Sequence, residues 1–314
     1  MKEPLIVLTG PTAVGKTALS VALAKAVNGE IISADSIQVY KYMDIGSAKI
    51  KPDEMQGIKH YLIDEIEPDE EFNVMLFQKY ANEYIRQIRK KGKLPIIVGG
   101  TGFYIQAVLY GINFTEHETD TSYRDELMQL SIENGPEFLY ARLKAVDPEY
   151  ADTVHANNQK RVIRALEYYK QTGQKFSAHN KEQHENVSPY NFAYFVLTDE
   201  RERLYKRIEQ RIDMMLEEGL VDEVRGLLDK GYTKDLVSMQ GLGYKEIAAY
   251  LEGEMSLHEA VYVLKRDTRH FAKRQLTWFR REKEVTFIDK AAANYNDDVI
   301  LYEMLKVLKE KGIV

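Results

Sequence analysis

The sequence predicts an α/β fold, in which a parallel sheet carries helices on both faces and a helical segment interrupts the alternation. Short apolar runs recur along the chain, helical patterns separate them, and residues 113–187 contain no convincing strand. Strands that alternate with helices are typical of parallel sheets, because each crossover needs a helix-sized connection. We therefore expect a core of residues 1–112 and 188–314, and a helical insertion of residues 113–187.

The first strand is expected at residues 5–8, an unbroken apolar run that suits burial on both faces of the sheet. The stretch GPTAVGKT follows and matches the pattern G-x-x-x-x-G-K-[ST], and an Ala- and Leu-rich helix follows at residues 16–27. A strand, this loop and a helix make a P-loop, which binds phosphate through backbone N–H groups, a helix N-terminus and a lysine. The predicted core is therefore P-loop NTPase-like. The expected phosphate cradle consists of Gly10, Pro11, Thr12, Ala13, Val14, Gly15, Lys16 and Thr17, with the Thr17 hydroxyl as a ligand of Mg²⁺.

Further strands are expected at residues 31–32, 61–63, 94–98, 192–197 and 285–288, with helices at 74–91 and 200–230. Ligands bind at the carboxyl ends of strands in such sheets, so the residues there are candidates. Asp35 could be a general base, a Mg²⁺ ligand or a turn aspartate, and Asp64 is a second candidate acid. P-loop NTPases usually carry an acid at such a strand end to position Mg²⁺ and water. The run Gly99-Gly100-Thr101 has no acid there, so it favours binding of a substrate over activation of water.

The insertion is expected to form helices at residues 123–132, 136–146 and 158–171. Residues 261–283 carry eight Lys or Arg against two acids, whereas the whole chain has a net charge of −6. At about 100° per residue, the basic residues of this helix share roughly half of its circumference. They are Lys265, Arg266, Arg269, Lys273, Arg274, Arg280 and Arg281. This side could be a solvated helix surface or could bind a nucleic-acid backbone.

The composition is typical of a soluble globular protein, with 44% apolar and 29% charged residues. No apolar run approaches the roughly 20 residues that a bilayer span needs, and no leader is evident, so we expect no membrane association. The chain has no cysteine, which excludes disulfides and thiolate metal sites. The absence of cysteine fits a cytoplasmic protein. The sequence does not fix the oligomeric state, and we expect a monomer. The site itself leaves two classes open: a small-molecule or nucleotide kinase with ATP on the P-loop, or a transferase that holds another diphosphate there and acts on nucleic acid.

Seven stretches of the sequence resemble those of a known family, and this resemblance favours one of the two classes. They are GPTAVGKTALS, SADSIQVYKYMDIGSAK, KLPIIVGGTGFYI, RVIRALEYY with TGQ, LEEGLVDEV, GLGYKE and TRHFAKRQLTWFRR. Through them the chain resembles the bacterial tRNA dimethylallyltransferases, also called tRNA isopentenyltransferases. It departs from the family pattern at Ser47, Ile50 and Leu242, where Thr, Pro and Ile are usual. The stretch FTEHETDTSYRDEL also stands where the family insertion usually starts with Gly-Pro-Pro.

The resemblance implies transfer of a dimethylallyl group from dimethylallyl diphosphate to N6 of adenosine 37, beside the anticodon of tRNAs that read codons beginning with U. The P-loop then holds the departing diphosphate, with Mg²⁺ at Thr17 and Arg211 as a further candidate contact. Whether ATP also binds the P-loop is left open. Asp35 is implied as the proton acceptor, Thr101 as a contact of the bridging oxygen and amine, and Lys16 as the cation that stabilises the leaving group.

The resemblance also implies an anticodon stem-loop clamped by the insertion, with its target base extruded into the protein. The implied tRNA contacts are Asp35, Ser36, Ile37, Gln38, Thr101, Arg124, Gln159, Lys160, Arg161, Val162, Ile163, Gly241, Gly243, Tyr244, Lys245, Arg274, Gln275 and Arg280. The Gln38 amide could read a base edge. Trp278 could stack on a base, although its place on the apolar side of its helix favours core packing.

Overall fold

The computed structural model describes residues 2–114 and 122–314. Residues 115–121, which include part of the stretch that departs from the family pattern, lie outside the described residues. The chain forms two compact units, one of residues 1–109 and 189–314 and one of residues 110–188. None of the helices in the described ranges could span a bilayer, since none combines the needed length with a sufficiently apolar surface.

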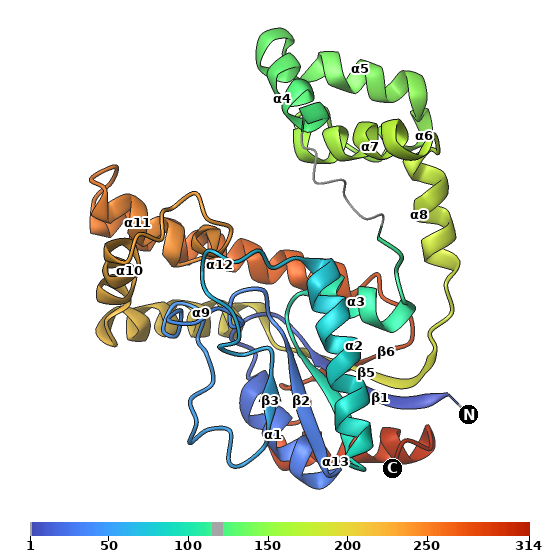
Figure 1. The fold of residues 1–314 in the computed structure, drawn as a ribbon. Helices are drawn as coiled ribbons and strands as arrows, with labels where there is room; N and C mark the ends of the chain where they lie inside the picture. Colours follow the sequence, from blue (N-terminus) through green and yellow to red (C-terminus); the bar gives the residue numbers. More distant parts are fainter. Residues whose placement is uncertain (1, 115–121) are drawn as a thin grey trace. The chain divides into compact units, whose positions relative to one another are not determined.

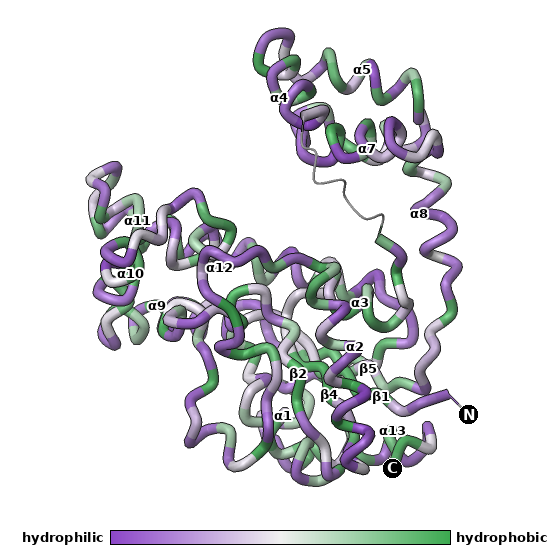
Figure 2. Tube along the Cα trace, viewed as in Figure 1, coloured by the Kyte–Doolittle hydropathy of each residue, from purple (hydrophilic) through white to green (hydrophobic). Residues whose placement is uncertain are grey.

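The larger unit is built on a parallel sheet with the strand order β3-β2-β4-β1-β5-β6 (Figure 1). Its strands are β1 (Glu3–Thr9), β2 (Gly29–Ala34), β3 (His60–Tyr61), β4 (Leu94–Gly99), β5 (Tyr190–Thr198) and β6 (Val285–Asp289). Every pairing between neighbouring strands is parallel. The apolar run of β1 is fully buried, and the strands at the centre of the unit carry long hydrophobic stretches, drawn green in Figure 2. The predicted α/β class with a parallel sheet is confirmed.

Helices cover both faces of this sheet. The helices between β1 and the smaller unit are α1 (Lys16–Ala26), α2 (Val74–Lys90) and α3 (Gly102–Tyr110). Right-handed crossovers place α1 and α2 on opposite faces. Helix α2 buries Phe77, Ala81, Ile85 and Ile88 at helical spacing, and the Asn73 side chain caps its N-terminus. The predicted P-loop is present, because the loop between β1 and α1 joins a buried strand to a helix N-terminus.

The C-terminal part of the larger unit is mostly helical, as predicted. Its helices are α9 (Arg201–Glu217), α10 (Leu220–Asp229), the 3-10 turn η1 (Ser238–Gln240), α11 (Tyr244–Leu251), α12 (Leu257–Phe279) and α13 (Asp297–Glu310). The prediction of one continuous helix at residues 200–230 is wrong, because this segment forms two helices, α9 and α10. Gly219 has φ of 103° at the break, a left-handed conformation that ends a helix.

The smaller unit is helical in its described residues. Its helices are α4 (Ser122–Asn134), α5 (Pro136–Val146), α6 (Pro148–Ala151), α7 (Gln159–Thr172) and α8 (Phe176–Glu185). Helices α4, α5 and α7 coincide with the three expected helices. Their apolar faces meet in a separate core that includes Leu127, Leu139, Leu143 and Leu166. Helix α7 ends at Gly173, whose φ of 68° gives a left-handed C-cap.

A buried acid joins β2 to its neighbours at the end of the sheet opposite the P-loop. Glu30 accepts hydrogen bonds from Lys93 Nζ at 2.9 Å, Lys91 Nζ at 2.9 Å and Tyr61 Oη at 2.7 Å. Burial by itself disfavours the charge of Glu30, but these donors, Lys93 first, lower its pKa to about 2. The ionised form is therefore stabilised by folding.

We predict that Glu30→Gln flattens part of the acid dependence of stability. A carboxyl group whose pKa falls on folding contributes stability above its unfolded pKa, and that contribution is lost as the pH drops towards the folded value, about 2. The wild-type free energy of unfolding should fall below roughly pH 4.5 more steeply than that of Glu30→Gln. Urea titrations at several pH values measure this, and parallel pH curves would contradict it.

Candidate active site

The carboxyl ends of β1, β4 and β2 lie side by side and bring three loops together. Strand β4 lies between the other two, and Gly99 at its end is level with both Thr9 and Ala34. The P-loop follows Thr9, and Asp35 follows Ala34. The Thr101 N–H donates to the Ala34 carbonyl oxygen at 3.1 Å, which fixes the third loop against the second. Two cavities open at this edge of the sheet.

The first, which we call the polar cavity, has a volume of about 380 Å³. The P-loop residues Thr12, Gly15, Lys16 and Thr17 line one side of it, and α9 lines the other through Arg207, Gln210, Arg211 and Met214. Lys16 Nζ donates to the carbonyl oxygens of Gly10 at 3.0 Å and Pro11 at 2.9 Å. Burial and the nearby Arg211 lower the pKa of Lys16 to about 8, against the opposing effect of Asp35.

The second, which we call the apolar cavity, has a volume of about 420 Å³. Its apolar lining comprises Phe72, Tyr104, Ile208, Ile212, Met215, Val237, Leu264 and Phe271. Twelve of the sequence-predicted residues also line it: Thr12, Ala13, Asp35, Ser36, Ile37, Thr101, Arg211, Gly241, Gly243, Lys245, Arg274 and Gln275. The departure positions Ser47 and Leu242 line it as well. Both cavities share Thr12, Ala13, Asp35, Ser47, Ala48 and Arg211. An anionic group and an apolar group joined together could therefore occupy the two at once.

Asp35 uses its two carboxylate oxygens differently. Oδ1 accepts hydrogen bonds from the N–H groups of Ile37 at 2.9 Å and Gln38 at 3.3 Å, as a turn aspartate does. Within residues 2–114 and 122–314, Oδ2 receives no hydrogen bond, and the side chain borders both cavities. Arg211, whose pKa burial lowers, interacts electrostatically with this carboxylate. One oxygen thus fixes the side chain while the other can accept a proton.

Gln275, which the resemblance implied as a tRNA contact, is buried and joins two of the three loops. Its Oε1 accepts from the Thr12 N–H at 2.9 Å, and its Nε2 donates to the Gly100 carbonyl oxygen at 3.0 Å. A Cβ atom on Gly100 would lie 2.2 Å from Nε2, so the glycine leaves room for this side chain. A Cβ on Gly102 would likewise lie 2.3 Å from Trp278 Cδ1. Because Gly100 and Gly102 have no side chains, the α12 side chains Gln275 and Trp278 can pack directly against this loop.

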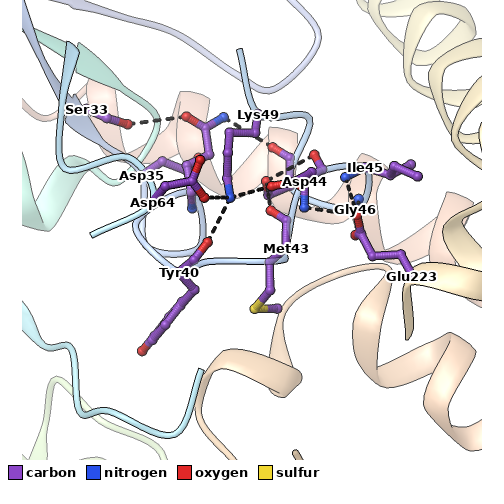
Figure 3. Close-up of polar contacts among 12 residues, drawn as sticks. Ser33, Asp35, Tyr40, Met43, Asp44, Ile45, Gly46, Lys49, Asp64 and Glu223 are labelled. Carbon is purple, nitrogen blue, oxygen red and sulfur yellow. Dashed lines mark hydrogen bonds and ion pairs between the residues drawn. The ribbon is translucent and has the colours of Figure 1, made fainter. Parts of the chain in front are cut away.

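Residues 44–49, which we call the clamp loop, are held by a distant carboxylate (Figure 3). Glu223 on α10 accepts from the N–H groups of Asp44 at 3.0 Å, Ile45 at 2.7 Å and Gly46 at 3.1 Å. Its Oε1 also accepts from the Tyr244 hydroxyl at 2.8 Å, which in turn accepts from the Ser47 N–H at 3.1 Å. Tyr244 is fully buried, so it reaches substrate only through the clamp loop, which lines both cavities.

Lys49, the last residue of the clamp loop, also helps to hold it in place. Lys49 Nζ is buried and pairs with Asp44 at 2.6 Å and with Asp64, and it donates to the Tyr40 carbonyl oxygen (Figure 3). The candidate acid Asp64 therefore forms an ion pair with Lys49, and it lines neither cavity.

Both polar atoms of the Gln38 amide form hydrogen bonds with nearby residues of the protein. Its Nε2 donates to the carbonyl oxygens of Ser47 and Ala48, each at 3.2 Å, and Ser33 donates to its Oε1 at 3.3 Å. Gln38 therefore supports the clamp loop in this structure and does not present a free amide edge to a base.

Exposed cations lie on α12 and just beyond its end. Lys265 pairs with Asp213, Arg269 with Glu209 and Arg266 with Asp267. The basic side that the sequence predicts is thus partly neutralised. Lys273, Arg274, Arg280 and Arg281 are exposed and have no acid partner within the part of the chain that the structure describes. The free positive charge is therefore concentrated towards the C-terminal end of α12.

In the smaller unit, the predicted contacts separate into exposed and buried residues. Lys160 and Arg161 are exposed in the first turn of α7, and Gln159 is half-buried there. Val162 and Ile163 are buried in the core of this unit. Arg124 forms a two-pronged ion pair with Glu167, with N–O distances of 2.9 and 3.1 Å. Arg124, Val162 and Ile163 therefore already have partners inside the protein.

The residues at the polar cavity fit a Mg²⁺ ion held jointly with phosphate. Among the described residues, no group of three or more His, Cys, Asp or Glu side chains could hold a metal by itself. Thr17 offers an exposed hydroxyl, and Asp35 is the acid that lines the cavity. Mg²⁺ is commonly bound through one or two such protein ligands, with substrate phosphates and waters supplying the rest.

Comparisons with known proteins identify the family. A family model described as "IPP transferase" matches residues 38–282. A protein of Lachnoclostridium phytofermentans named tRNA dimethylallyltransferase is 62% identical over 313 residues, which cover 99% of each chain. The chain belongs to the tRNA dimethylallyltransferase family.

Solved structures of this family share the fold. The full-length tRNA isopentenylpyrophosphate transferase of Bacillus halodurans is 44% identical, with a TM-score of 0.74 over 99% of this chain and 98% of that one. A eukaryotic dimethylallyltransferase, described as acting on tRNA, is 30% identical, with a TM-score of 0.79 over 91% of this chain and 74% of that one. The family resemblance expected from the sequence is confirmed, and with it the P-loop NTPase-like fold.

Sequence reasoning missed Glu223, Lys49 and Arg207. Glu223 lies within LEEGLVDEV, one of the stretches that carry the resemblance, but nothing in its local pattern indicates that it binds a loop from 177 to 179 residues away. Arg207 stands one helical turn before Arg211, and this spacing was the available signal that both face one cavity.

The lowered pKa of Lys16 predicts how anion binding depends on pH. Lys16 is charged below about pH 8 and neutral above it, so the affinity for inorganic diphosphate should fall as the pH rises through about 8. Lys16→Met should bind diphosphate more weakly and should lack this fall. Calorimetric titrations of both proteins between pH 7 and pH 9, in the same buffers, measure the difference. Equal pH dependence in the two proteins would refute the assignment.

We also predict that Glu223→Gln impairs catalysis through the clamp loop. A glutamine amide would face backbone N–H groups, and hydrogen bonds to a charged group are worth about 1.5–3 kcal/mol, so kcat/KM should fall by about tenfold or more. Asp222→Asn is the matched control, because Asp222 is an exposed neighbour that pairs with Arg225. Steady-state kinetics would contradict the prediction if both variants kept wild-type kcat/KM.

Proposed function

We propose that this chain transfers a dimethylallyl group from dimethylallyl diphosphate to N6 of adenosine 37 in tRNAs that read codons beginning with U, and releases diphosphate. The observation that carries the proposal is the meeting of a polar and an apolar cavity at Asp35 and Arg211. A prenyl diphosphate has the same two parts, an anionic head and an apolar tail. The family to which the chain belongs supports this reaction over the kinase alternative.

The polar cavity would bind the diphosphate. As the C–O bond breaks, its electron pair stays on the bridging oxygen, and the developing charge faces Lys16, the P-loop N–H groups and Arg211. Preorganised donors of this kind stabilise a transition state because they need no rearrangement when the charge appears. Mg²⁺, held by Thr17 together with phosphate oxygens, would supply further neutralisation of the leaving group.

The nucleophile would be the exocyclic amine of the extruded adenine. A new N–C bond forms at the prenyl carbon, and the amine proton passes to Asp35 Oδ2, the oxygen that its own turn leaves free. Thr101 lies at the same strand edge and would donate its hydroxyl hydrogen bond to the bridging oxygen or orient the amine. Proton acceptance by a positioned carboxylate is general base catalysis.

The anticodon stem-loop would be bound by exposed cations and by the lining of the apolar cavity. Lys273, Arg274 and Arg280 on and after α12, and Lys160 and Arg161 on α7, offer charge to phosphates. Within the larger unit, Ser36, Ile37, Gly241, Gly243 and Lys245 border the cavity into which the base would enter. Buried residues of the implied set, such as Tyr244 and Val162, would support these contacts from inside.

A monomer suffices for this reaction, because one chain supplies both cavities and all of the candidate groups. The proposed location is the cytoplasm. The direct test incubates the protein with labelled dimethylallyl diphosphate, Mg²⁺ and unmodified tRNA. Label in the RNA, lost when adenosine 37 is replaced by guanosine, is the expected result. Absence of transfer, with production of ADP from ATP and a small acceptor, would favour a kinase instead.

Asp35→Asn tests the proposed base. The asparagine oxygen can still accept from the Ile37 and Gln38 N–H groups, so the turn is preserved while the base is removed. General base catalysis typically contributes about 10²–10⁴-fold, and we expect single-turnover transfer to fall within that range. Affinity for tRNA, measured by filter binding, should stay unchanged. Near-normal transfer by Asp35→Asn would remove Asp35 from the mechanism.

A further inference from the structure

Helix α9 presents two arginines to the polar cavity, one helical turn apart. Arg207 and Arg211 both line it, and the Arg207 guanidinium nitrogen Nη2 lies 3.5 Å from the position that a Cβ atom on Gly15 would take. Arg207 therefore lies over the P-loop itself. Like charges at this spacing repel each other along a helix, so the pair is unfavourable unless something between them is negative.

No acid among the described residues supplies that negative charge to Arg207. The polar cavity is lined by the cations Lys16, Arg207 and Arg211 and by one carboxylate, Asp35, which gives a formal charge of +2. In the described ranges no acid pairs with Arg207 and no hydrogen bond holds it. Two nearby cations differ in this respect. Arg203 pairs with Asp199. Lys290, which follows β6 and approaches Gly15, donates to Asp297 at 2.9 Å.

The two arginines border different spaces. Arg211 lines both cavities and interacts with Asp35, which places it at the junction where the donor would react. Arg207 lines only the polar cavity, on the side of Gly15. A diphosphate whose prenyl carbon faces the junction would have its terminal phosphate on the Arg207 side.

We propose that Arg207 binds the terminal phosphate of the donor and of the diphosphate product, and that it makes the site select a diphosphate over a monophosphate. This inference rests on the proposed function, since the donor's orientation follows from it. A guanidinium can donate two parallel hydrogen bonds to one phosphate group, which suits a residue that recognises the terminal group.

The test is calorimetric titration with inorganic diphosphate and with orthophosphate, both with Mg²⁺, of the wild type and of three variants. Hydrogen bonds to charged groups imply that Arg207→Gln should bind diphosphate about tenfold to hundredfold more weakly. Its affinity for orthophosphate should change little. Arg207→Lys should recover part of the loss. Lys206→Gln is the control, because it removes an equal charge from a neighbouring exposed residue that lines neither cavity.

Thermal melts separate binding from a structural role. Without ligand, Arg207→Gln should melt no lower than the wild type, because the substitution removes a like-charge repulsion. The rise in Tm that diphosphate causes should be smaller in the variant. A lower Tm without ligand, or wild-type affinity for diphosphate, would overturn the proposal.

The titration uses neither tRNA nor turnover, so its result stands apart from the proposed function. If the wild type binds diphosphate through Arg207 but transfers no label to tRNA, the proposed function fails and the anion contact remains. If label is transferred while Arg207→Gln binds diphosphate normally, the reaction remains and the role of Arg207 fails.

Discussion

Strand β4 lies between β1 and β2 and is hydrogen-bonded to both. This arrangement is the constraint on which the site depends, because parallel strands end at a common edge and their following loops must share it. The P-loop, Asp35 and the Gly99–Thr101 turn are therefore neighbours although they are separated by up to about 90 residues. Gln275 then joins two of these loops through a pair of hydrogen bonds.

The clamp loop, residues 44–49, forms another part of the lining and has no regular structure of its own. Its conformation depends on two charged side chains, namely Glu223 of α10 and the loop's own Lys49, which pairs with Asp44 and donates to the Tyr40 carbonyl oxygen. A carboxylate that accepts several backbone N–H groups can hold such a loop more firmly than neutral partners can. The same principle applies at Asp35, where one oxygen holds the turn so that the other is presented to substrate.

The features that the sequence predicted are those with a local pattern. Leu5, Ile6, Val7 and Leu8 form a buried strand because an unbroken apolar run has no polar face to expose, and the loop after them has a fixed phosphate-binding spacing. Most contacts that could not be predicted join residues far apart in the sequence. Examples are Glu223 with the clamp loop and Gln275 with Gly100, which only the folded chain brings together. The contact of Gln38 with Ser47 spans nine residues, but it lies within an irregular loop whose sequence has no periodicity. Gly219 shows a second limit, since a single glycine can be tolerated in a helix or can end it.

The proposed reaction requires a prenyl diphosphate to lie across the junction of the two cavities, with its reacting carbon beside Asp35. The most direct measurement is a crystal structure with the unreactive thiodiphosphate analogue of the donor. We expect the diphosphate between Lys16 and α9 in the polar cavity, and the apolar tail at the junction, within reach of an amine that contacts Asp35 Oδ2. A diphosphate bound outside the P-loop, or a tail directed away from Asp35, would contradict it.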